Sequence, residues 1–250
     1  MHSSNNPYFD ELQCLLNNEI TNEHIIFNSN LPFLKLDIPP VPVKEIYEEL
    51  DSLKDHFTIP NQRFDYSEKL YKDYFNKDLT IKPSEDRTLT KADFNKCCNL
   101  FVYDLNPTSD LSQKTPFTTN YINTFLGKDI IFHRAQANLL TPGGWISPHV
   151  DEIGKDALKF KMGGKPGQLC TLNIAITHPE GSKIYIKNCG NVPFKEGDAF
   201  LIDVTRVHGV YNPNFYRYHL IIRFDWCNSN LNDNELLRRS YLKALGNYKY

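Results

Sequence analysis

The sequence predicts a mainly β fold for the second half of the chain, arranged as an antiparallel sandwich or barrel. From about residue 128 onward, short β-rich segments recur at even spacing and turn residues separate them, which is typical of such folds. The chain has 250 residues, of which 40% are hydrophobic, and this is enough to bury one substantial core. Its 16 Phe and 14 Tyr residues also favour β structure.

The N-terminal half shows fewer clear elements. Residues 1–40 are polar and rich in Asn, and they end in a proline-containing stretch that favours a rigid extended connection. Residues 43–57 are predicted to form a helix because apolar side chains recur there at helical spacing. Residues 58–90 have weak periodicity, and residues 91–127 indicate helical or mixed structure.

The C-terminal half divides into strands and one helix. Strands are expected at 129–140, 171–178, 182–188, 198–204, 208–212 and 216–226. After Asn230, the stretch ELLRRSYLKALG predicts a short C-terminal helix. We therefore expect one globular unit made of an N-terminal helical or mixed region, a β core and a C-terminal helix, at 1–127, 128–230 and 231–250.

Composition limits the class of protein. The formal net charge of -2 does not favour nucleic acid or a membrane surface as a partner. The N-terminal residues do not follow the pattern of a signal peptide, and no segment approaches the apolar length of a membrane helix. The cysteines lack a paired spacing and are expected to be reduced thiols of a cytoplasmic protein; they lie at 14, 97, 98, 170, 189 and 227.

Three residues form a candidate metal site. His149 and Asp151 are two positions apart, so in a strand their side chains point to the same face. His208 follows the apolar strand at 198–204 and is the natural third ligand. Two neutral imidazoles and one carboxylate make the facial triad of non-haem Fe(II) oxygenases. The alternative is that His149 is a loop residue, Asp151 a turn or cap residue and His208 a hydrogen-bonded core histidine.

Two arginines on the last strand suggest a carboxylate ligand. Arg217 and Arg223 share the same parity, and an arginine pairs with a carboxylate through two parallel hydrogen bonds. Such a cation would bind the far carboxylate of a 2-oxoglutarate co-substrate. A solvated outer-face charge is the alternative for one of the two. His219 shares their face; it could touch the co-substrate, but a packed strand histidine is the preferred interpretation.

The segment from His133 to Trp226 resembles a known family. Its matching pieces are ANLLTPGGWISPH, LNIAITHPEGSKIYIKN, VPFKEGDAFLIDVTRVHGVYN and RYHLIIRFDW. They resemble the aspartyl/asparaginyl/proline β-hydroxylase family of Fe(II)/2-oxoglutarate-dependent dioxygenases. The resemblance implies a double-stranded β-helix core, also called a jelly roll or cupin-like fold. It would have about eight strands, with N-terminal helices and one C-terminal helix around them.

The resemblance also implies roles for individual residues. His149 and His208 match the family's iron-binding histidines, and Asp151 matches the carboxylate position. Arg217 matches the arginine that binds the far carboxylate of 2-oxoglutarate, which favours it over Arg223. Asn138 matches a polar co-substrate contact. The implied reaction consumes 2-oxoglutarate and O₂, releases succinate and hydroxylates an amino-acid side chain, free or within a peptide.

Two residues depart from the family pattern, and several alternatives for the function remain open. Asn173 and Thr171 stand where some members carry a histidine and an arginine, so the substrate of those members is not assumed here. Residues 152–168 are rich in glycine and lysine and are interpreted either as a lid or as a plain solvated loop. The other classes left open are a cupin-like Zn or Mn hydrolase or isomerase and an inactive jelly-roll binding domain. Nothing in the sequence determines the oligomeric state.

Overall fold

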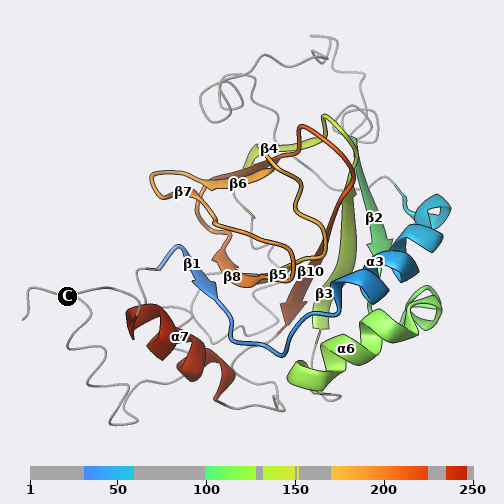
Figure 1. Ribbon diagram of the computed structural model, residues 1–250, viewed down its shortest axis with the longest axis horizontal. Helices are drawn as coiled ribbons and strands as arrows, with labels where there is room; N and C mark the ends of the chain where they lie inside the picture. Colours follow the sequence, from blue (N-terminus) through green and yellow to red (C-terminus); the bar gives the residue numbers. More distant parts are fainter. Residues whose placement is uncertain are drawn as a thin grey trace, which may run out of the picture.

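Two antiparallel β-sheets face one another at the centre of the protein (Figure 1). This computed structural model describes residues 31–58, 99–127, 132–149, 151, 170–224 and 235–246. The strands are β1 (Phe33–Lys35), β2 (Leu100–Asp104), β3 (Phe132–Leu140), β4 (Trp145–His149), β5 (Cys170–Ala175), β6 (Lys183–Ile186), β7 (Gly190–Asn191), β8 (Ala199–Asp203), β9 (His208–Tyr211) and β10 (Arg217–Phe224). The helices are α3 (Val43–Ser52), α6 (Pro116–Leu126) and α7 (Leu236–Gly246).

The last eight of these strands form a double-stranded β-helix. The large sheet has the order β1-β8-β5-β10-β3-β2 and the small sheet the order β4-β9-β6-β7. The chain crosses between the sheets after β3, β4, β5, β7, β8 and β9, so the strands wind around a common interior. This confirms the jelly-roll core of about eight strands, which the even spacing of strand segments and the family resemblance together predicted.

The N-terminal region contributes to the large sheet as well as to the helices. Strand β1 pairs with β8 at one edge, and β2 pairs with β3 at the other. The large sheet therefore crosses the division expected at residue 128. Strand β2 lies within the stretch 91–127, for which the sequence indicates helical or mixed structure. Its two buried residues, Leu100 and Tyr103, are three positions apart, so it lacks the two-residue alternation typical of a strand.

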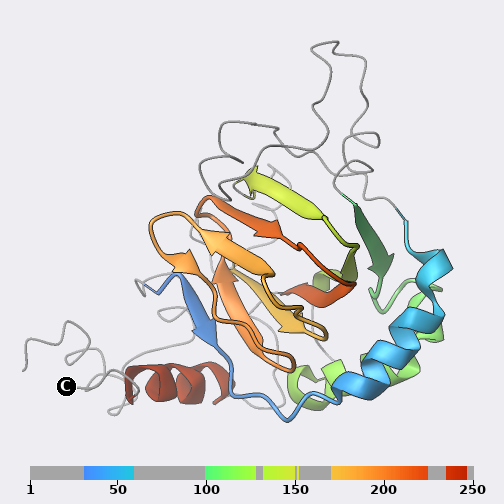
Figure 2. The ribbon, with the colours of Figure 1, turned by 45° about the horizontal axis from the view of Figure 1, so that its top comes forward.

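Helices cover the outer face of the large sheet (Figure 2). Strand β10 alternates, so Tyr218, Leu220 and Ile222 point outward and are completely buried beneath the helices. In α3, Ile46 and Leu50 are one turn apart and fully buried, which explains the helical spacing seen in the sequence. The helix ends at Ser52, earlier than predicted, and a 3-10 turn at Lys54–His56 then brings Phe57 onto Tyr103, with ring centroids 5.3 Å apart.

The inner face of the large sheet is apolar at one end and polar at the other. Leu140, Ala175 and Phe200 pack against Ile184 and Val210 of the small sheet. Farther along β3 and β5, the inward positions carry polar and charged side chains instead, namely Asn138, Gln136, Arg134, Asn173 and Thr171. The packed apolar end fixes the two sheets relative to each other, and the polar end forms the site described below.

Some predictions concern parts of the chain that the structure does not describe. The loop at 152–168 and the cysteines at 14, 97, 98 and 227 lie outside the described residues. Cys189 is a free thiol. Within the described ranges, the helices are too short or too polar to cross a membrane.

Glu49 joins two of the covering helices. Its carboxylate accepts hydrogen bonds from the backbone N–H groups of Phe117 and Thr118, both at 2.8 Å, and from the Thr118 hydroxyl at 2.6 Å. These N–H groups lie in the first turn of α6, where no intrahelical acceptor exists. A carboxylate from α3 thus caps α6 and complements the positive end of its dipole.

We predict that Glu49→Ala lowers the free energy of unfolding by about 1–3 kcal/mol, because it leaves two N–H groups of α6 without a charged acceptor. Urea denaturation of the full chain measures this. Glu48→Ala is the matched control, since Glu48 is exposed and 3.9 Å from Lys44, and it should change stability by less than about 0.5 kcal/mol. Equal effects of the two substitutions would contradict the capping role.

Candidate metal centre

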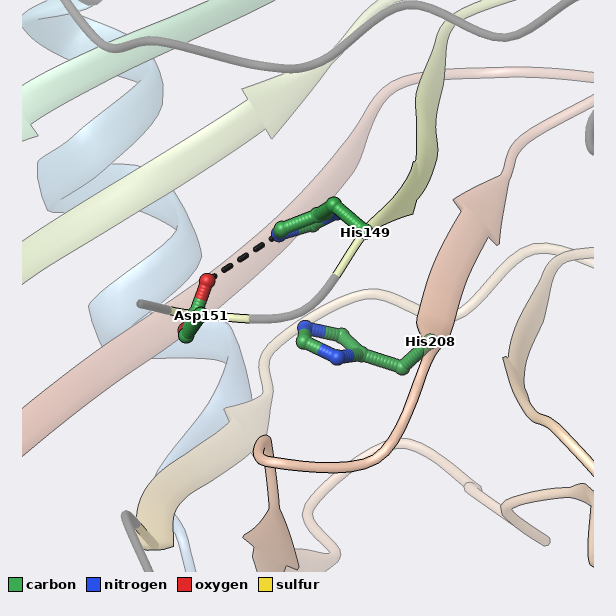
Figure 3. Close-up of side chains that lie close together, drawn as sticks. All are labelled: His149, Asp151 and His208. Carbon is green, nitrogen blue, oxygen red and sulfur yellow. Dashed lines mark ion pairs between the residues drawn. The ribbon is translucent and has the colours of Figure 1, made fainter. Parts of the chain in front are cut away.

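His149, Asp151 and His208 converge at one end of the jelly roll (Figure 3). Each offers one ligand atom, and the three atoms lie within 4.8 Å of one another. His149 Nε2 is 3.1 Å from Asp151 Oδ1, and the two imidazole ring centroids are 4.4 Å apart. The three residues predicted from sequence spacing are therefore brought together, in an arrangement that could hold one metal ion.

Strand pairing explains how the ligands meet. His149 at the end of β4 is directly opposite His208 at the start of β9. The register shifts by one residue between Ile146 and His149, and Pro148, which cannot donate a backbone hydrogen bond, lies within this irregularity. Asp151 lies just beyond β4, and its backbone N–H donates to the carbonyl of Val204 at 3.1 Å. The pairing of β4 with β9 thus aligns His149 with His208. The hydrogen bond to Val204, which directly follows β8, positions Asp151.

The environment keeps His208 ready for a metal. Burial lowers the pKa of His208 to about 4, and His149 acts in the same direction, while Asp151 and the carbonyl of Arg206 oppose the shift. The imidazole is therefore neutral at pH 7. Its Nδ1 lies 2.9 Å from the Arg206 carbonyl oxygen, which requires a proton on Nδ1 and leaves Nε2 as the ligand atom.

Asp151 is held from two sides. Its Oδ1 contacts His149, while Arg223 donates to its Oδ2 and, at 3.0 Å, to the hydroxyl of Thr171. Burial raises the pKa of Asp151, but the hydrogen bond with His149 and the charge of Arg223 outweigh burial and hold the pKa well below its usual range. Asp151 is thus an ionised carboxylate whose orientation Arg223 fixes.

A polar cavity extends from the metal ligands along the inner face of the large sheet. Arg223 is paired in register with Arg134, Ile221 with Gln136 and His219 with Asn138. Across the other side of β10, Asn173 is opposite Ile221. The cavity lining includes Arg134, Gln136, Asn138, Thr171, Asn173, Arg217 and Arg223. The polar residues predicted as co-substrate contacts therefore share one cavity with the metal ligands.

Arg217 is the most unusual residue of this cavity. Its side chain lines the cavity yet is only 2% exposed, and its Nε has no hydrogen-bond partner. Burial lowers the pKa of Arg217 to about 9, which still leaves it charged at neutral pH. Among the residues described by the structure, no carboxylate forms an ion pair with it. A buried cation of this kind is costly unless an anion joins it.

The family follows from a sequence comparison. The model of the aspartyl/asparaginyl beta-hydroxylase family matches residues 43–226. The chain belongs to this family. The protein is therefore an enzyme, a 2-oxoglutarate-dependent hydroxylase. The match extends well before His133, so the family covers much of the N-terminal half as well.

Solved structures with a similar arrangement include three prolyl hydroxylases. The enzyme from Trichoplax adhaerens, in complex with a hypoxia inducible factor peptide fragment, is 8% identical with a TM-score of 0.49, over 88% of this chain and 94% of that one. The collagen prolyl hydroxylase of Paramecium Bursaria Chlorella virus-1, in complex with 2-oxoglutarate, is 15% identical with a TM-score of 0.42, over 78% and 96%. The Pseudomonas putida prolyl-4-hydroxylase is 9% identical with a TM-score of 0.40, over 82% and 98%. No curated protein matches the chain.

Within this hydroxylase, the two candidate arginines have different surroundings. Arg223, the alternative for the co-substrate carboxylate, instead contacts Asp151 and Thr171. Arg217 keeps a donor without a partner. The contact between Arg223 and Asp151 was not foreseen, because nothing in the sequence aligns β10 with the residue that follows β4.

We predict that Arg223→Gln weakens divalent metal binding by about 10- to 100-fold, because Asp151 loses the partner that orients it. Titration of the metal-free full chain with Co(II) measures the dissociation constant. Arg238→Gln is the matched control, since Arg238 pairs with Glu235 on the remote helix α7 and should leave the affinity unchanged. Wild-type affinity in Arg223→Gln would contradict the orienting role.

We predict that the metal-free protein loses stability as the pH falls from about 6.5 toward 4. Burial lowers the pKa of His178 and of His208 to about 4, and that of His219 well below its usual value. The unfolded chain therefore takes up these protons first, so stability is complete above pH 6.5 and declines below it. Urea denaturation with a chelator at pH 7, 5.5 and 4.5 tests this, and a constant free energy of unfolding would contradict it.

Proposed function

We propose that this hydroxylase binds Fe(II) through His149, Asp151 and His208. It uses 2-oxoglutarate and O₂ to hydroxylate an amino-acid side chain, either free or within a peptide. The reaction converts 2-oxoglutarate and O₂ to succinate and CO₂, with one oxygen atom entering the new hydroxyl group. The observation that carries this proposal is the buried, charged Arg217 with its unpaired Nε in the cavity that the metal ligands share.

The donor set suits iron. Two neutral histidines and one ionised carboxylate on one face of a metal are typical of non-haem Fe(II) oxygenases, and they leave positions open for further ligands. When bound, the metal supplies O₂ activation coupled to the oxidative decarboxylation of the co-substrate. The chain's own part is to orient the three ligands and to keep His208 neutral and Asp151 ionised, which the lowered pKa values of these two residues favour.

Arg217 suits a dicarboxylate. A 2-oxo acid that chelates the metal at one end must find a cation for its far carboxylate, and Arg217 lines the same cavity. A Zn hydrolase has no need of such a residue. Asn138 and Asn173 line the cavity between the two ends and would contact the co-substrate through their amides. The family name indicates an aspartyl- or asparaginyl-type side chain as the substrate.

Succinate formation tests the proposal. The full chain is loaded with Fe(II) without oxygen, given 2-oxoglutarate and O₂ together with a mixture of peptides and amino acids, and analysed by mass spectrometry. We expect succinate and a product heavier by one oxygen atom. His149→Ala should abolish both, whereas the matched control His56→Ala should retain them, because His56 is exposed on the 3-10 turn after α3.

Changing the co-substrate gives a second test of the proposal. Replacing 2-oxoglutarate with 2-oxobutyrate removes the far carboxylate and keeps the metal-chelating end. We expect wild-type protein to turn over 2-oxoglutarate far better than 2-oxobutyrate, and Arg217→Met to lose most of this preference. Absence of succinate from iron-loaded wild-type protein would refute the proposed function.

A further inference from the structure

A chain of hydrogen bonds runs behind the cavity from Arg217. Arg217 Nη2 lies 3.0 Å from His219 Nδ1, and His219 Nε2 lies 3.3 Å from His178 Nδ1. Arg217 lines the cavity, whereas His219 lies behind it and is completely buried. His219 therefore contacts the arginine and not the space that a ligand would occupy.

The direction of donation in this chain is fixed. A guanidinium can only donate, so His219 Nδ1 must accept and its proton must be on Nε2. That proton is then donated to His178 Nδ1, which places the proton of His178 on its own Nε2. Both imidazoles are neutral in this arrangement. Burial together with the charge of Arg217 lowers the pKa of each, which agrees with this state.

Phe194 packs against both histidine rings of the chain. Its ring meets His219 edge-on at a centroid distance of 5.0 Å and lies 5.6 Å from the ring of His178. Phe194 also packs against Phe200 of β8, with ring centroids 4.6 Å apart. The imidazole of His219 thus has little freedom to rotate, and its acceptor nitrogen stays directed at Arg217.

A neutral hydrogen-bond acceptor beside Arg217 affects the charge of the arginine differently from a carboxylate. A buried carboxylate beside Arg217 would neutralise it and would compete with any anion entering the cavity. An imidazole accepts one hydrogen bond, fixes the plane of the guanidinium, and leaves the positive charge uncompensated. The unpaired Nε of Arg217 agrees with a cation that is oriented but not neutralised.

We propose that His219, supported by His178, is a positioning residue that holds Arg217 in one orientation and leaves its charge available to the far carboxylate of 2-oxoglutarate. This inference rests on the proposed function. It assigns no role in the reaction itself to either histidine. It predicts that full co-substrate affinity requires a neutral acceptor at position 219, so that an acceptor carrying a negative charge weakens binding.

Two substitutions of equal size separate these properties. His219→Asn keeps a neutral acceptor, whereas His219→Asp keeps an acceptor and adds a negative charge. Calorimetric titration of the Ni(II)-loaded full chain with 2-oxoglutarate gives the Kd for each. We expect His219→Asn to bind within about threefold of wild type and His219→Asp to bind about 10- to 100-fold more weakly. The same pair of substitutions at exposed His56 should leave the Kd unchanged.

The outcomes separate this inference from the function on which it rests. No binding of 2-oxoglutarate by wild-type protein overturns the proposed function. Binding by wild type with equal weakening in both variants overturns only the positioning role. Nitrogen NMR of labelled wild-type protein at pH 7 gives an answer even if a variant does not fold. Neutral His219 and His178 with protons on Nε2 support the inference, and a proton on Nδ1 of His219 refutes it.

Discussion

Strand β10 lies within the large sheet, and its side chains point alternately to the outer and the inner face. The other features of the structure depend on this alternation. This strand pairs with β3 on one side and β5 on the other, so its register cannot move without disrupting both neighbours. Its outward residues anchor the helices: Tyr218 donates a 2.8 Å hydrogen bond to Asp51 of α3 and packs against Tyr47 of the same helix. Because the outer face is fixed in this way, the inward face presents Arg217 and Arg223 to the cavity and places His219 directly behind Arg217.

The candidate site therefore has its arginines on one sheet and its two candidate histidine ligands on the other. His149 and His208 belong to the small sheet, while Arg217 and Arg223 belong to the large one. Arg223 bridges the two through Asp151. The distance between the three candidate metal ligands and Arg217 is consequently set by how the sheets pack at their apolar end. Core substitutions at that end should change this distance without contacting the candidate ligands or Arg217.

Much of this site was predictable from local rules. The two-residue spacing of His149 and Asp151, and the shared parity of Arg217 and Arg223, need only the alternation of a strand. The family resemblance then selected the jelly roll and Arg217. What could not be predicted depends on long-range register. The cross-strand pairing of His149 with His208 and the contact of His178 with His219 join residues 59 and 41 positions apart. The strand expected at 171–178 includes His178, but β5 ends at Ala175, and the contact of His178 with His219 depends on the turn that follows β5.

The same register explains a departure from other members of the family. The sequence resemblance places Thr171 where some family members carry an arginine. Here Arg223 and Arg134 are already directly opposite each other, and burial together with Arg223 lowers the pKa of Arg134. Like charges opposite each other in a sheet are destabilising, so a third guanidinium at position 171 would face an unfavourable field. A threonine instead accepts a hydrogen bond from Arg223 Nε at 3.0 Å and leaves its Nη2 for Asp151. Thr171 and Arg223 are therefore best understood as a matched pair, in which the hydroxyl directs the arginine toward the carboxylate of the metal centre.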